Sequence, residues 1–213
     1  DHAPGCACAA RVVACAVKGD DLDNRALGGV KIDVIMGRDA GFLAAASSLA
    51  RQRPDDGPHL IYLPETPFSE TRFVRDVKSA MKKFGRCVIA VSEGIRGKDG
   101  IPIGAKLADG ERDSHGNVQM SGTGALGDAL ARIVKAKCGI KRVRADTFGY
   151  LQRSFPGVVS ETDREEAFLA GAAAVRAALE SGVNKGTIGI VREEAKSYKV
   201  AYAVRPISDA AKD

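Results

Sequence analysis

The sequence predicts an α/β fold, a three-layer α/β/α sandwich in which a parallel sheet lies between two layers of helices. Short apolar runs of strand length, at 30–35, 59–63 and 87–91, alternate with longer segments of helical periodicity. Such alternation requires parallel strands, because right-handed crossover helices must cover both faces of the sheet. The 213 residues are 45% hydrophobic and 28% charged, as expected of a globular protein with one substantial core.

The N-terminal third predicts a helix, a strand and a second helix. Residues 7–27 place small and apolar residues at helical spacing. Residues 30–35, VKIDVI, predict a mostly buried strand. Residues 42–49 begin FLAAASS, and this run of small residues predicts a helix that packs closely against the sheet.

The middle of the chain predicts two more strands with a helix between them. The strands are HLIYL at 59–63 and CVIAV at 87–91. Ser69 stands where its hydroxyl can cap a helix over 71–84. Residues 96–120 are polar, rich in glycine and too long for a simple connection, so we expect an ordered excursion or hairpin over the site.

The C-terminal third predicts one strand, a helix and two closing strands. In residues 142–146, valine and alanine alternate with charged residues, which indicates a short strand with one apolar and one charged face. Residues 160–163 have the spacing of a capping box that begins a helix. The closing strands are expected at 186–191 and 198–204, and the second alternates as a strand with one solvated face does.

Charge and composition favour a small anionic ligand over a nucleic acid or a membrane. The net charge is +5, yet the basic residues are spread along the chain, only 5% of residues are aromatic and there is no tryptophan. Nucleic-acid-binding proteins more often combine a basic stripe with aromatic side chains. The chain has no run of about 18 apolar residues and no signal-peptide pattern, so we expect neither a membrane span nor export.

The five cysteines predict a cytoplasmic protein without a disulfide framework, because their number is odd and their spacing does not repeat. Cys6 and Cys8 have the spacing of half a metal site. No second pair completes four ligands, so we interpret both as small packing residues.

The densest group of candidate site residues lies at 142–156, RVRADTFGYLQRSFP. It contains Arg142, Arg144, Tyr150 and Arg153. A guanidinium group can grip a phosphate in two places, and ligands of open α/β sheets collect just past the strand ends. The alternative is a charged strand edge whose loop arginine pairs with a nearby aspartate.

Two other predicted strands end in residues that suit the same ligand. The first is followed by Met36, Gly37 and Arg38, where the glycine lets the backbone approach a ligand and the arginine points a cation into the crevice. Another ends beside Glu93, which adds a carboxylate. The alternatives are a glycine turn with one surface arginine, and a glutamate paired with Arg96.

A glycine pattern at 122–127 competes with this interpretation. It fits GxGxxG and precedes a predicted helix at 128–137, with Asp146 at the end of a later strand, which is the outline of a dinucleotide-binding fingerprint. That function would make the protein a dinucleotide-dependent oxidoreductase. The fingerprint needs a hydrophobic strand directly before its first glycine, and residues 114–121, SHGNVQMS, do not supply one. We therefore expect a helix entry without a nucleotide.

Four segments resemble the phosphofructokinases and together cover nearly the whole chain. Met36-Gly37-Arg38 with Asp39-Ala40-Gly41-Phe42, and Glu93 at the third strand end, are similar to sugar-phosphate-binding segments of that family. The first residues, Asp1-His2-x-Pro4-Gly5, resemble the segment that follows the family's catalytic loop. A further sugar-phosphate-binding segment is matched by Arg144, Tyr150, Leu151, Gln152, Arg153, Pro156, Asp163 and Arg164.

The resemblance is strongest to the pyrophosphate-dependent branch, because the ATP-dependent enzymes usually have a histidine in place of Tyr150 and two glycines after the position of Arg153. It implies a phosphotransferase of glycolysis that converts D-fructose 6-phosphate to D-fructose 1,6-bisphosphate with pyrophosphate as the donor. An ATP-dependent 6-phosphofructokinase and a noncatalytic sugar-phosphate-binding fragment stay open as alternatives.

The resemblance also implies roles for the site residues. Arginine side chains would hold the phosphate, and Glu93 would accept hydrogen bonds from sugar hydroxyls. Arg144 would reach into the site of a neighbouring subunit, which implies a homodimer or a homotetramer. The family often has a basic residue seven positions before Met36, where Gly29 stands here. The implied substrate-binding residues are Met36, Gly37, Arg38, Glu93, Arg144, Tyr150, Leu151, Gln152 and Arg153.

By the same resemblance, the aspartate that acts as catalytic base, the ligands of Mg²⁺ and the phosphoryl-donor loop lie upstream of Asp1. The fold would be a phosphofructokinase-type sandwich that is incomplete at its N-terminus, and this chain would hold no metal ligand. We expect residues 31–139 to form the sugar-phosphate-binding domain. Residues 1–30 and 140–213 would be the remainder of the donor-side domain and closing elements. Such a chain binds sugar phosphate without turning it over.

Overall fold

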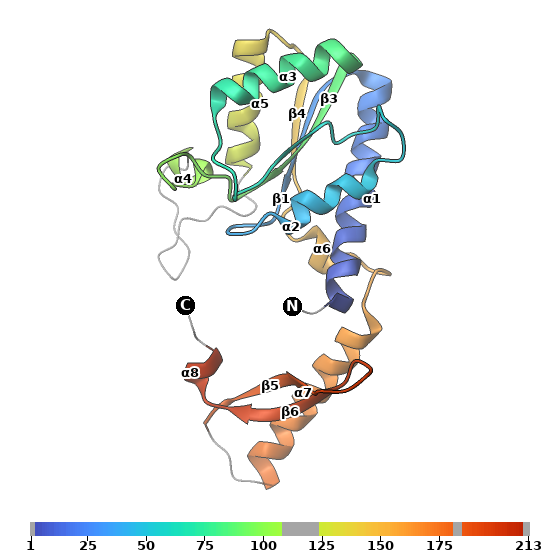
Figure 1. The fold of residues 1–213 in the computed structure, drawn as a ribbon, viewed down its shortest axis with the longest axis vertical. Helices are drawn as coiled ribbons and strands as arrows, with labels where there is room; N and C mark the ends of the chain where they lie inside the picture. Colours follow the sequence, from blue (N-terminus) through green and yellow to red (C-terminus); the bar gives the residue numbers. More distant parts are fainter. Residues whose placement is uncertain (1–2, 108–123, 181–184, 211–213) are drawn as a thin grey trace. The chain divides into compact units, whose positions relative to one another are not determined.

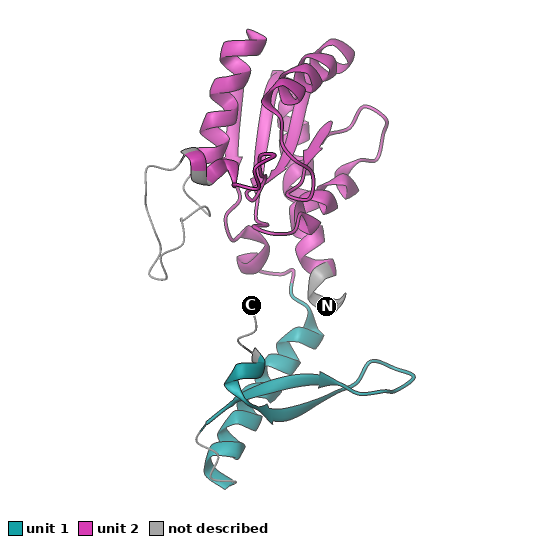
Figure 2. Ribbon diagram, turned by 60° about the vertical axis from the view of Figure 1, so that its left-hand side comes forward, with its two compact units in different colours: residues 1–6, 159–213 teal, residues 7–158 magenta. Residues whose placement is uncertain are grey.

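The computed structural model describes residues 3–107, 124–180 and 185–210, and it divides into two compact units. The larger unit is residues 7–158, and the smaller unit is residues 1–6 with 159–213 (Figure 2). The sequence placed boundaries at 30/31 and 139/140. In the structure, the segments on either side of 31–139 both contribute helices and strand residues to the larger unit.

The larger unit is built on one four-stranded sheet in the order β2-β3-β1-β4. All three pairs of neighbouring strands are parallel, as predicted, and Ile32 of the central strand lies opposite Ile89 and Ala145. The strands are β1 (Gly29–Ile35), β2 (Leu60–Tyr62), β3 (Arg86–Ser92) and β4 (Val143–Thr147).

Helices cover both faces of this sheet and complete the predicted three-layer sandwich (Figure 1). One face packs on α3 (Glu70–Phe84) and α5 (Ala125–Cys138), with Phe73 and Leu130 fully buried. The other face packs on α1 (Ala3–Leu27) and α2 (Phe42–Ala46). Each fully buried valine, isoleucine or phenylalanine contributes about 1.5–3 kcal/mol, so these two apolar layers stabilise the unit.

Ion pairs attach α1 to the rest of the larger unit. The Asp21 carboxylate is fully buried and pairs with Arg86 of β3. Asp56, in the loop before β2, accepts hydrogen bonds from Lys18 at 2.7 Å and from Arg25 at 2.8 Å. Losing one partner of a buried pair leaves an uncompensated charge, so these contacts fix where α1 lies on the sheet.

Local signals explain both ends of α3. The Ser69 hydroxyl accepts a hydrogen bond from the Arg72 amide at 3.4 Å, which confirms the predicted cap of α3. Gly85 ends that helix with φ of 71°, a conformation that glycine adopts without steric cost. The helix predicted over 42–49 is α-helical only to Ala46 and continues as the 3₁₀ turn η1 (Ser47–Ala50).

The predicted excursion over 96–120 lies partly outside the described residues. Its first part contains a bridge between Arg96 and Pro102, followed by the short helix α4 (Ile103–Leu107). After the gap, α5 begins at Ala125, three residues earlier than predicted.

The smaller unit packs one long helix against a two-stranded antiparallel sheet. The Ser160 hydroxyl accepts a hydrogen bond from the Asp163 amide at 3.2 Å, so the predicted capping residue begins this helix. The elements are α7 (Glu161–Glu180), β5 (Thr187–Arg192), β6 (Val200–Arg205) and α8 (Ile207–Ala210). Among the helices that the structure describes, none has the length and apolar character needed to cross a membrane.

Candidate active site

The register of the sheet brings three strand ends to one edge. Ile35, the last residue of β1, lies opposite Ser92, the last residue of β3. Hydrogen bonds to the carboxyl end of β1 continue past the ends of β3 and β4, since the Ile35 carbonyl accepts from the Glu93 amide at 2.9 Å and the Val34 carbonyl accepts from the Phe148 amide at 2.9 Å. The segments after β1, β3 and β4 therefore all start at the same edge of the sheet.

These segments surround one cavity of about 460 Å³. The cavity has a carboxylate on one element and guanidinium groups on two others, so it can receive a ligand that carries both hydroxyl and anionic groups. Six residues that the sequence predicted for one site share it. The lining residues are Met36, Gly37, Arg38, Ala40, Phe42, Leu43, Glu93, Tyr150 and Arg153.

The turns after β1 and β3 pack against each other so closely that glycine is required. A Cβ atom on Gly94 would stand 1.9 Å from the Arg38 carbonyl oxygen. Gly37 has φ of 153°, and a Cβ atom there would stand 2.6 Å from the Ala40 carbonyl oxygen. The Ser92 hydroxyl also donates a hydrogen bond to the Gly37 carbonyl. These contacts set the position of Arg38 relative to Glu93.

Glu93 is the buried acid of the cavity, with 6% of its surface exposed. Its Oε1 accepts a hydrogen bond from the Gly37 amide at 3.4 Å. Arg96, which the alternative interpretation paired with Glu93, forms an ion pair with Asp39 and donates to the Arg38 carbonyl at 3.2 Å. The acid and the backbone after β1 are thereby held together.

The basic side chains of the cavity are exposed. Arg153 belongs to the one-turn helix α6 (Leu151–Ser154), and its guanidinium carbon lies 5.3 Å from the centroid of the Tyr150 ring. Arg38 is exposed as well. Two solvent-accessible guanidinium groups beside one buried carboxylate give the cavity a cationic rim and an acidic wall, an arrangement that suits a phosphorylated sugar.

Three predicted site residues do not line the cavity. Arg144 is exposed within β4, two residues before Asp146. Leu151 and Gln152 are half-buried on α6, and the Gln152 side-chain amide donates to the Met36 sulfur at 2.8 Å. Gln152 therefore contacts a site residue without lining the cavity itself.

Phe42 and Leu43 line the cavity although neither is among the predicted substrate-binding residues. Phe42 is 81% exposed at the start of α2, where the sequence indicated a helix that packs on the sheet. Its place in the segment directly after Arg38 was the available signal. Side-chain direction at a helix start depends on the turn geometry, which the pattern does not report.

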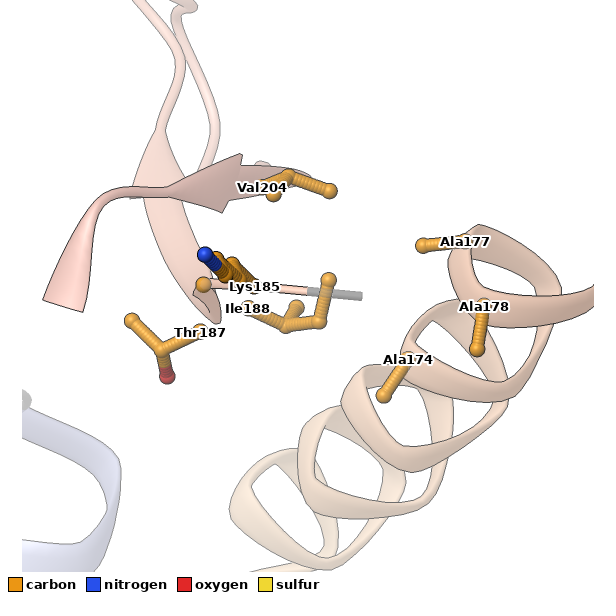
Figure 3. Close-up of a pocket in the computed structure, with 8 residues that line it drawn as sticks. Ala174, Ala177, Ala178, Lys185, Thr187, Ile188 and Val204 are labelled. Atoms are coloured by element: carbon orange, nitrogen blue, oxygen red, sulfur yellow. The ribbon is translucent and has the colours of Figure 1, made fainter. Parts of the chain in front are cut away.

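The smaller unit has a hollow of about 520 Å³ between α7 and the ends of β5 and β6 (Figure 3). Ala174, Ala177 and Ala178 form its helical wall, and Lys185 is the one charged residue among the described residues that line it. Without converging polar groups, this hollow offers no comparable chemistry.

The other candidate sites gain no support. Gly122 and Thr123 of the glycine pattern lie outside the described residues, and Asp146 forms an ion pair with Lys31. Within residues 3–107, 124–180 and 185–210, no three His, Cys, Asp or Glu side chains are grouped so that they could hold a metal ion. Cys8 is half-buried on α1.

Comparison with known proteins identifies close similarities. The family model described as phosphofructokinase matches residues 1–178. A pyrophosphate–fructose 6-phosphate 1-phosphotransferase of Rhodospirillum rubrum is 55% identical over 212 residues, which are 99% of this chain and 52% of the relative. The enzyme of the same name from Xanthomonas campestris is 39% identical over 188 residues, which are 86% of this chain and 43% of the relative.

The fold has a solved counterpart. The crystal structure of a pyrophosphate-dependent phosphofructokinase from Marinobacter aquaeolei superposes with a TM-score of 0.64 and 30% identity, and the match covers 95% of this chain and 46% of that chain. The chain thus spans about half the length of the curated relatives that it matches.

Proposed function

Since this chain belongs to the phosphofructokinase family, we propose that it forms the sugar-phosphate-binding part of an enzyme that phosphorylates fructose 6-phosphate with pyrophosphate as the donor. The product is fructose 1,6-bisphosphate. One observation carries the proposal: Arg38, Glu93 and Arg153 come from three separate segments and line the same cavity.

The basic and acidic groups of the cavity bind different parts of the substrate in this proposal. Arg38 and Arg153 are exposed forks of N–H donors and bind the phosphate of fructose 6-phosphate. Glu93 accepts hydrogen bonds from the sugar hydroxyls, which a carboxylate can do from both oxygens. The Met36 and Gly37 backbone and Tyr150 enclose the sugar between them. These residues bind and orient the acceptor.

Phosphoryl transfer also needs a base that accepts the acceptor's proton and charge neutralisation by a divalent metal. We propose that Mg²⁺ fills this role and that its ligands and the base aspartate belong to the part of the relatives that this chain does not span. The residues that the structure describes do not offer a group for the ion.

We propose further that the enzyme is a cytoplasmic homodimer or homotetramer. Arg144 is exposed on β4 and outside the cavity of its own chain, as a residue that serves a neighbouring subunit would be. The Arg144→Ala exchange then lowers substrate affinity only in the assembled protein. Gel filtration with light scattering measures the assembly.

Isothermal titration of the 213-residue chain tests the proposed binding. Fructose 6-phosphate binds, and unphosphorylated fructose binds at least about tenfold more weakly, because charge-assisted hydrogen bonds to phosphate contribute about 1.5–3 kcal/mol. Equal affinity for the two sugars contradicts the assignment of the phosphate to the arginines.

A coupled assay tests the division between binding and chemistry. We expect the isolated chain to transfer no phosphoryl group from pyrophosphate or ATP, whereas a polypeptide that includes the remaining half of the relatives uses pyrophosphate. Substantial turnover by the isolated chain contradicts the proposed position of the base, and preference for ATP in the longer polypeptide contradicts the proposed donor.

A further inference from the structure

Asp33 is a fully buried acid of the larger unit. It lies in the middle of β1, none of its surface is exposed, and with its carboxylate ionised neither oxygen meets a hydrogen-bond donor among the described residues. An isolated buried carboxylate is so costly that it gains a counter-ion, gains a donor or keeps its proton.

Lys31, the cation nearest to Asp33 in the strand, already pairs with two other carboxylates. Lys31 lies two residues before Asp33 and on the same face of β1, since side chains alternate along a strand. Its ammonium group is paired with Asp146 of β4 and, at 3.2 Å, with Asp20 of α1. One ammonium group thus serves two carboxylates, and Asp33 is a third acid in the same cluster.

The groups that face Asp33 are Asp20 from α1, Lys31 from β1 and Asp146 from β4. Burial raises the pKa of Asp33 well above the ordinary value, and the negative charge and hydrogen bonding of Asp20 raise it further. Asp146 acts in the same direction, and Lys31 opposes them without cancelling them. Two carboxylates side by side cannot both be ionised cheaply.

A metal ion and a cation from another molecule are the other ways to neutralise the Asp33 carboxylate, and neither fits the structure. Among the described residues no acidic group is arranged as a metal site. A cationic side chain from another molecule cannot reach Asp33, because β1 is a central strand and α1 covers this part of the sheet. For the residues that the structure describes, a proton is the counter-ion that remains.

We propose that Asp33 keeps its proton in the folded protein and donates it to the Asp20 carboxylate, so that a carboxylic acid and a carboxylate clasp α1 to β1. The clasp requires one proton. It opens when that proton is lost, because two like charges then face each other at the contact between the helix and the strand.

This clasp makes the stability of the larger unit depend on pH in the direction opposite to that of most paired aspartates. A raised folded-state pKa means that the folded state binds more protons than the unfolded state between the unfolded and folded pKa values. The stabilisation is complete below the ordinary aspartate pKa of about 3.9. It falls as pH rises, by about tenfold in the folding equilibrium per pH unit, until the folded-state pKa is passed.

Carbon-13 NMR of the side-chain carboxyl groups tests the proposal on the unmodified chain. The Asp33 signal is assigned by its loss in Asp33→Asn. We expect it to stay at the position of a protonated acid well above pH 4 and to titrate late. An Asp33 carboxyl that titrates near pH 4, as an exposed aspartate does, overturns the proposal.

Unfolding in urea between pH 4.5 and pH 8.5 provides the second measurement. Asparagine has the same shape and stays neutral, so Asp33→Asn removes the decline of stability that the unmodified chain shows with rising pH. Asp23→Asn, at an exposed position on α1, is the matched control and keeps that decline. A difference between Asp33→Asn and the unmodified chain that is constant across the range overturns the proposal. If Asp33→Asn does not fold, the carboxyl titration of the unmodified chain decides, with the Asp33 signal assigned by through-bond experiments.

Discussion

The guanidinium group of Arg153 lies over the ring of Tyr150, with 5.3 Å between the guanidinium carbon and the ring centroid. Both side chains line the cavity, and both are exposed. The ring attracts the cation through its electron-rich face and limits the directions in which Arg153 can point. Tyr150 therefore orients the arginine that we assign to the phosphate.

Replacing Tyr150 separates the ring from its hydroxyl. Tyr150→Ala removes the stacking, which contributes about 0.5–1 kcal/mol at an exposed site, and raises the dissociation constant for fructose 6-phosphate about two- to fivefold. Tyr150→Phe keeps the ring and loses less affinity. Titration calorimetry measures both variants. Equal losses would show that the hydroxyl, and not the ring, is what matters.

Replacing either cavity arginine weakens binding more strongly. Arg38→Ala or Arg153→Ala removes a charged hydrogen-bond donor, and we expect a loss of about 1.5–3 kcal/mol, roughly a ten- to 150-fold higher dissociation constant for fructose 6-phosphate. Arg75→Ala, an exposed position on α3 outside the cavity, is the control and leaves affinity unchanged. Thermal unfolding of the three variants checks that the fold is intact. Unaltered affinity in both cavity variants removes these arginines from the site.

The contact between the turns after β1 and β3 predicts a specific loss of stability. In Gly94→Ala the new methyl group overlaps the Arg38 carbonyl oxygen, so the turns must separate, at a cost of about 1–3 kcal/mol. Gly19→Ala is the control, because a Cβ atom on Gly19 meets nothing within 4 Å. Alanine has the higher helix propensity there and stabilises α1 by up to about 1 kcal/mol. Urea unfolding measures both, and a Gly94→Ala variant as stable as the unmodified chain contradicts the close approach.

The contribution of Asp56 to folding stability is expected to decrease as the pH falls, as is usual for paired aspartates. Hydrogen bonds from the Lys18 side chain and from the Gln52 amide lower the pKa of Asp56. Its stabilisation is therefore present above the ordinary pKa and is lost as pH falls through the folded-state value. Asp56→Asn destabilises the chain at pH 7, and the difference shrinks as the pH is lowered below about 4. Unfolding curves at several pH values check this. A difference in unfolding free energy between Asp56→Asn and the unmodified chain that grows on acidification would contradict this prediction.

Most of the fold was predictable because its signals are local. The alternation of apolar runs and helical segments predicted all four parallel strands, and hydroxyl side chains at Ser69 and Ser160 marked the two helix starts that they cap. Element ends were less accurate, as at the helix that begins at Phe42. There a run of small residues does not distinguish an α-helix from a 3₁₀ turn.

Much of the candidate site was predictable for the same reason. Met36-Gly37-Arg38, Glu93 and the segment that begins at Tyr150 each follow a strand directly, and parallel strands end at one edge of the sheet. The roles of these residues in binding remain predictions. Arg144 shows where this reasoning stops, since it lies within the strand and outside the cavity.

The sequence by itself determined the succession of strands and helices along the chain, the helix starts and the family. Each of these rests on residues that are close together in the chain. Only the tertiary structure decided which side chains meet. It placed Gly94 against the Arg38 carbonyl and Phe42 at the cavity, and it buried Asp33 near Asp20 with no cation of the described residues left unpaired beside it. Distances between separate segments, and the burial that sets the charge of an acid, arise when the layers pack, and a one-dimensional pattern does not contain them.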